Sequence, residues 1–73
     1  MATASSVSCL AQIGETAGVV WKTLTDNGPM TMAKLVKAVG GPRDLVMQAI
    51  GWLAREDKVS IEEERRSRII SLR

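Results

Sequence analysis

Two apolar segments joined by a glycine pair decide the fold: residues 31–55 read TMAKLVKAVGGPRDLVMQAIGWLAR. In the first segment, Leu35 and Val39 recur at helical spacing after Thr31, a residue type that caps helix N-termini. The glycine pair then ends this helix after barely two turns. Two short helices joined by a glycine-containing turn are typical of a helix-turn-helix.

The second helix of this motif follows Pro42, which suits the first position of a helix. Asp44 in its first turn complements the positive end of the helix dipole. We expect this helix to run to about Arg55 or Glu56. Four residues at helical spacing form its predicted core stripe: Val46, Ala49, Ile50 and Leu53.

An N-terminal helix precedes the motif. The helical pattern begins near Val7 and should stop at Asn27 and Gly28, because glycine commonly ends helices. Residues 1–6 are small and polar, and we expect a flexible tail there. One face of the helix is predicted to carry Leu10, Ile13, Ala17, Trp21 and Leu24.

The pattern changes to a strand rhythm after Asp57. Apolar and polar residues alternate up to Glu63, the run Arg65-Arg66-Ser67 breaks the alternation, and a second β-branched segment runs from Arg68 to Leu72. The apolar residues expected to lie against the helices are Val59, Ile61, Ile70 and Leu72. The sequence therefore predicts a mostly α fold with a small β-hairpin (α+β): a winged helix-turn-helix of three helices followed by a two-stranded wing.

The chain has 73 residues, which is enough for one domain, and we expect that domain over residues 7–73. Its formal charge is +2. Histidine is absent and Cys9 is the only cysteine, which excludes a zinc site of the usual type and an intrachain disulfide. No pair of groups suggests catalysis. We expect no enzyme activity, no cofactor, no metal and no small-molecule ligand. No apolar run could cross a bilayer and no secretory signal is visible, so we expect a cytoplasmic protein.

Two tryptophan-containing runs carry a family resemblance. The run from Gly51 to Val59 reads GWLAREDKV and the run from Thr16 to Trp21 reads TAGVVW. Together they resemble a family of short, stand-alone bacterial winged helix-turn-helix proteins of unknown function. The resemblance covers roughly Ile13 to Leu72. It implies the winged-helix fold and a bacterial setting, and it carries no established ligand.

The helix after Pro42 suggests DNA binding, because the second helix of such a motif enters the major groove. Its outward side carries Gln48 and Arg55, with Arg43 at a flank. Gln48 suits adenine, and Arg43 suits guanine or phosphate. Two lysines on the preceding helix are candidates for backbone contacts: Lys34 and Lys37.

The predicted wing has two interpretations. Arg65, Arg66 and Arg68 lie at its tip, where they could reach phosphate. The run Glu62 to Glu64 comes immediately before them, so the same arginines could instead form exposed cross-strand ion pairs of about 1 kcal/mol or less.

Three large apolar residues suggest a second surface. Leu45 and Trp52 lie seven residues apart beside the core stripe, and Trp21 adds a ring on the first helix. They either widen the core or form an interface patch, most simply for a homodimer. Gly14 and Gly18 would let two first helices approach closely. The function that we expect is docking of the third helix and the wing on double-stranded DNA, as a transcriptional regulator or accessory factor. The alternative is a protein-interaction or dimerisation module without DNA affinity.

Overall fold

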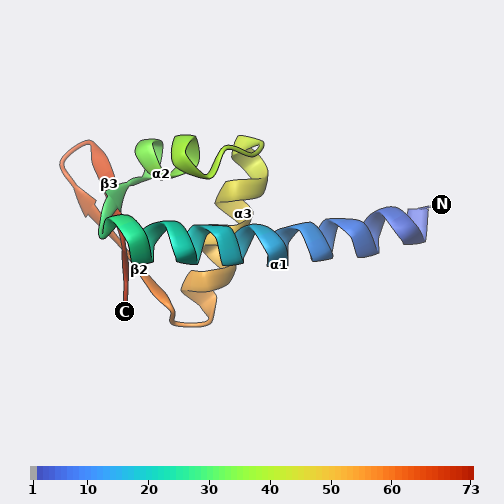
Figure 1. Cartoon of the computed structure of the whole chain (residues 1–73). Coiled ribbons are helices and arrows are strands. Elements are labelled where there is room, and N and C mark those ends of the chain that lie inside the picture. The colour runs from blue at the N-terminus through green and yellow to red at the C-terminus, as the bar shows by residue number, and fades with distance from the viewer. Residues whose placement is uncertain (1) are drawn as a thin grey trace.

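Three helices pack against a small antiparallel sheet in the computed structural model, which describes the backbone of residues 2–73 and the side chains of residues 9–73 (Figure 1). The elements follow in the order α1 (Ala2–Asn27), β1 (Met30–Thr31), α2 (Met32–Val39), α3 (Arg43–Arg55), β2 (Val59–Glu64) and β3 (Ser67–Leu72). This order confirms the predicted α+β winged-helix class. Helix α1 begins at Ala2, earlier than the predicted start near Val7. The flexibility predicted for residues 1–6 stays a prediction.

Helix α1 ends where the sequence predicts. Gly28 has a φ of 77°, and its N–H donates to the Leu24 carbonyl at 2.8 Å. The Asn27 side chain also donates to the Thr23 carbonyl at 2.8 Å. These bonds satisfy carbonyls that the end of a helix leaves unpaired.

The apolar face predicted for α1 lies only partly in the core. Ala17 and Leu24 are buried as expected, but Val20 lies between them in the core, while Leu10 and Trp21 are 61% and 47% exposed. The reason is tertiary: α3, α2 and β3 cover only the side of α1 centred on Val20. Leu10 precedes the covered part, and Trp21 points to one flank of it.

Helix α2 is delimited by the two caps that the sequence predicts. The Thr31 hydroxyl accepts a hydrogen bond from the Lys34 N–H at 3.2 Å. At the other end, Gly40 takes φ 83°, and its N–H donates to the Val36 carbonyl at 3.2 Å. Leu35 is buried between these caps.

Helix α3 places its whole predicted stripe in the core. Pro42 caps the helix rather than opening it, since α3 begins at Arg43. Ten buried apolar residues form one core that all three helices and two strands share: Ala17, Val20, Leu24, Leu35, Val46, Ala49, Ile50, Leu53, Val59 and Ile70.

The sheet has a third strand that the sequence did not reveal. Its order is β1-β3-β2, and β1 pairs antiparallel with the middle of β3, with Met30 opposite Ile70 and Thr31 opposite Ile69. Strand β3 is therefore central, and α1 and α2 contact it. Ile61 lies on the edge strand β2 and is 41% exposed, so its predicted place against the helices is wrong.

The glycine that ends α2 offers a stability test. Gly40→Ala is expected to lower the free energy of unfolding by about 1 to 2 kcal/mol, because a β-carbon disfavours a positive φ. An added β-carbon would meet nothing within 4 Å there, so backbone strain alone sets the cost. Gly51→Ala is the control: it lies inside α3 in equally open space, and helix propensity should raise stability by about 0.5 to 1 kcal/mol. Urea denaturation measures the free energy of unfolding of both variants. Equal changes in the two would contradict the strained conformation assigned to Gly40.

Candidate nucleic-acid interface

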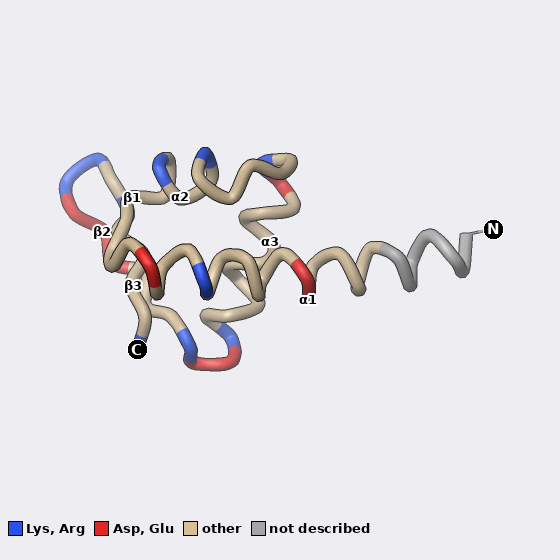
Figure 2. Tube along the Cα trace, in the orientation of Figure 1, with Lys and Arg blue, Asp and Glu red and all other residues tan. Residues whose placement is uncertain are grey.

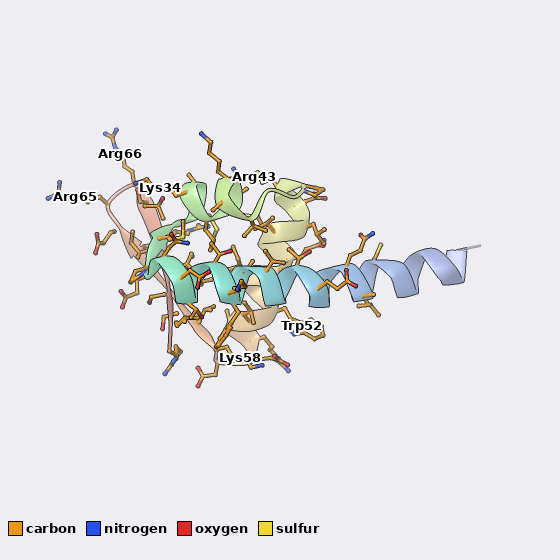
Figure 3. All side chains as sticks on the ribbon, in the orientation of Figure 1. Lys34, Arg43, Trp52, Lys58, Arg65 and Arg66 are labelled. Atoms are coloured by element: carbon orange, nitrogen blue, oxygen red, sulfur yellow. The ribbon has the colours of Figure 1, made fainter. Side chains whose placement is uncertain are left out.

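The start of α2, the start of α3 and the hairpin surround a basic cleft of about 380 Å³. Four arginines line it, one from α3 and three from the hairpin: Arg43, Arg65, Arg66 and Arg68. Figure 2 shows basic residues gathered along α2, the start of α3 and the hairpin loop. Figure 3 shows Lys34, Arg43, Arg65 and Arg66 on the same side of the molecule.

The hairpin loop presents two of these arginines. Glu64 pairs with Ser67 across the hairpin, so Arg65 and Arg66 form a two-residue loop. Arg65 takes φ 54°, which the first central residue of a tight hairpin turn requires. The backbone turn therefore places both side chains at the tip of the wing. Both are exposed.

The acidic run beside the tip neutralises only part of this charge. The Arg68 Nε atom lies 3.7 Å from a carboxylate oxygen of Glu63, its cross-strand partner. Among residues 9–73, neither Arg65 nor Arg66 forms an ion pair. Each interpretation of the wing therefore holds for different residues. Arg68 is in an exposed ion pair, whereas Arg65 and Arg66 in the loop are available to an external anion.

The two lysines of α2 lie three residues apart and share one face of the helix. Lys34 and Lys37 are exposed. Lys34 extends on the side of Arg43 and Arg66 in Figure 3. They add positive charge beside the cleft without lining it.

The other candidates on α3 lie outside the cleft. Gln48 is exposed and borders a separate hollow between α3 and α1, together with Asp44 and Gln12. Arg55 is the last residue of α3, about 18 Å along the helix axis from Arg43. The structure therefore brings Arg43 together with the wing and leaves Gln48 and Arg55 on the outward row of the helix.

Sequence reasoning missed Thr31, Ala33 and Met47, which also line the basic cleft. Thr31 reaches the cleft because β1 pairs with β3 and brings the start of α2 beside the wing. Met47 follows Arg43 by one helical turn. No local pattern marks these residues, because their position depends on the docking of the sheet.

The proposed interface residues separate into two places. Trp21 and Trp52 line one groove of about 450 Å³, with Gly14 and Gly18 on the α1 side of it. Leu45 is half-buried and borders the hollow that contains Gln48. The tryptophans therefore share a surface, and Leu45 does not belong to it.

Among the side chains of residues 9–73, no three His, Cys, Asp or Glu gather in a way that could hold a metal ion. No helix within residues 2–73 is both long and apolar enough to cross a bilayer.

Comparisons with known proteins agree with the winged-helix fold. The family model described as Winged helix-turn-helix domain (DUF2582) matches residues 9–72. An uncharacterized protein of the archaeon Methanocaldococcus jannaschii is 35% identical over 65 residues, which cover 85% of this chain and 91% of that protein. The bacterial setting that the resemblance implies is untested, since this relative is archaeal. With its three helices and antiparallel wing, and a family model that covers nearly all of it, the chain belongs to the winged helix-turn-helix domain family DUF2582.

Proposed function

We propose that this protein binds double-stranded DNA through the basic cleft and the outward row of α3. One observation carries the proposal: the fold brings Arg43 at the start of α3 into the same cleft as Arg65 and Arg66 at the wing tip. The winged-helix family supports a nucleic-acid role in general. Positive side chains converging from separate elements provide the electrostatic basis that duplex affinity needs.

The mechanism that we propose is electrostatic docking with limited base readout. Arg65 and Arg66 contact backbone phosphates or reach into the minor groove beside the wing. Lys34 and Lys37 contact phosphates of the adjacent DNA strand. Arg68 contributes less, because its ion pair with a glutamate must be broken before it can bind phosphate.

Base readout falls to α3. Gln48 lies in the middle of the outward row, where its amide matches the donor and acceptor of adenine in the major groove. Arg43 can bind guanine or a phosphate at one end of the helix. Arg55 lies too far along the helix to share a contact with Arg43, and its partner would be a separate phosphate. Asp44 opposes phosphate and limits how closely this row approaches the backbone.

The biological role that follows is that of a transcriptional regulator or accessory factor in the cytoplasm. Winged helix-turn-helix domains are typically not enzymes. We accordingly propose no catalytic residue, cofactor or small-molecule ligand.

Fluorescence anisotropy of a labelled random-sequence duplex, titrated at several salt concentrations, tests the proposal. We expect micromolar binding at low salt. The plot of log K against log salt is expected to have a slope of about −5 if six basic side chains each contact a phosphate. The absence of binding even at low salt would overturn the DNA proposal and favour the alternative of a protein-interaction module.

A further inference from the structure

The tryptophan groove, lined by Gly14, Gly18, Trp21 and Trp52, is a second surface that the proposed DNA contacts do not use. Its two rings are 47% and 44% exposed for Trp21 and Trp52, respectively. Its lining also includes Ala17, Leu53, Glu56 and Lys58. In Figure 3, Trp52 and Lys58 lie on the opposite side of the molecule from Lys34, Arg43 and Arg66. Large half-exposed rings that converge on one groove are the usual mark of a protein contact.

One flank of α1 forms the floor of this groove. It carries Leu10, Gly14, Gly18 and Trp21 at steps of four, four and three residues, which aligns them along one side of a helix. Leu10 is exposed, and an added β-carbon at either glycine would meet nothing within 4 Å. The flank thus offers a bulky apolar residue at each end and a shallow depression between them.

We propose that a second copy of this chain covers the tryptophan groove, through an antiparallel contact between the two α1 helices that cross near Gly18. A two-fold contact uses the same patch on both copies, so the ring of Trp21 must meet a depression of the partner. Crossing near Gly18 places Trp21 opposite the partner's Gly14, and the reverse contact occurs at the same time. The two glycines allow the helix axes to come close.

Charge selects the antiparallel direction. Glu15 and Lys22 are seven residues apart, so they lie on the same side of α1, beside the glycine flank. An antiparallel crossing near Gly18 lies midway between them and brings each Glu15 toward the partner's Lys22, twice per dimer. A parallel two-fold contact would instead place the two copies of each residue on opposite edges of the interface, where neither pair forms. Among the side chains of residues 9–73, neither forms an ion pair within its own chain.

Sedimentation velocity of the whole chain without DNA, over a concentration series, tests this dimer. We expect a dimer for the natural sequence and a Kd at least tenfold weaker for Gly18→Leu, because a large side chain at the crossing separates the helices. Gly51→Leu is the matched control, since Gly51 is a helical glycine in open space outside the groove. It should leave the Kd unchanged. Far-UV circular dichroism checks that both variants fold.

The direction of the contact is tested by charge exchange. Glu15→Lys and Lys22→Glu should each weaken the dimer, and the double variant should restore it, which a purely structural defect would not do. Tryptophan emission should move to shorter wavelength as the dimer forms, because Trp21 and Trp52 leave water. A monomer at every concentration, or a dimer that Gly18→Leu leaves unaltered, would overturn the proposal. The measurements contain no DNA, so their failure is distinct from failure of the proposed function.

Discussion

Replacing Arg65 and Arg66 together with alanine is expected to weaken binding to all duplex sequences alike, by about ten- to a hundredfold near 0.1 M salt. The two side chains lie at the wing tip without an intramolecular ion pair among residues 9–73, so their full charge is available to phosphate. Each lost phosphate contact removes about 0.9 from the salt slope. The slope should therefore become shallower by about 2, as measured by anisotropy titration over the same salt series.

A matched control removes the same charge elsewhere. Lys58 and Arg73 lie next to each other, since the Arg73 N–H donates to the Lys58 carbonyl at 3.1 Å. Lys58 is on the side away from the basic cleft (Figure 3). Unlike the loop arginines, both form exposed ion pairs, Lys58 with Glu56 and Arg73 with Asp57. Replacing both with alanine lowers the net charge by the same amount and should change the affinity little. If both double variants lose affinity equally, net charge rather than the wing drives binding; if the wing variant binds like the natural chain, the wing makes no contact.

Ile50→Ala is expected to lower the free energy of unfolding by about 2 to 5 kcal/mol, because it removes buried methyl groups and leaves a cavity. Ile50 is 1% exposed in the middle of α3, where that helix packs on α1. A domain of this size has a total stability of only about 4 to 11 kcal/mol. The variant should therefore lose a large share of the stability of the domain.

Urea denaturation followed by circular dichroism measures this effect. Val19→Ala is the control, because Val19 is an exposed residue of α1, and its change should stay within about 0.5 kcal/mol. A loss below 1 kcal/mol for Ile50→Ala would mean that the contact between α1 and α3 does not anchor the core.

The sequence predicted the features that depend on local chemistry. Thr31, Gly40 and Gly28 end or begin helices through hydrogen bonds to residues three or four positions away, so their roles are visible in the chain itself. The stripe of α3 was predicted for a similar reason, because its period matches one helix face. Strand β1 was not predicted, since a two-residue strand has no period and exists only through its pairing with Ile69 and Ile70.

The candidate site could be predicted as residues but not as an arrangement. Arg43 and Arg65 belong to separate elements, and only the docking of the hairpin brings them to one cleft. The same limit explains Trp21 and Leu45. Periodicity placed Trp21 on the apolar face of α1 and left open whether α3 covers it; α3 covers a neighbouring strip of that helix. Spacing grouped Leu45 with Trp52, yet the surrounding elements separate them into different hollows.

The positions of the basic cleft and the tryptophan groove on opposite sides of the molecule determine the geometry of any dimer joined at the groove. Such a dimer would be bivalent, with its two DNA-binding faces pointing away from each other. It could not read two adjacent half-sites of a palindrome on one straight duplex. Each face would instead hold its own segment, so the pair would bridge two duplexes or close a loop between distant stretches of one. The affinity of the dimer for the two DNA segments would then depend on the effective concentration of one segment near the other, rather than on the spacing of half-sites in an operator.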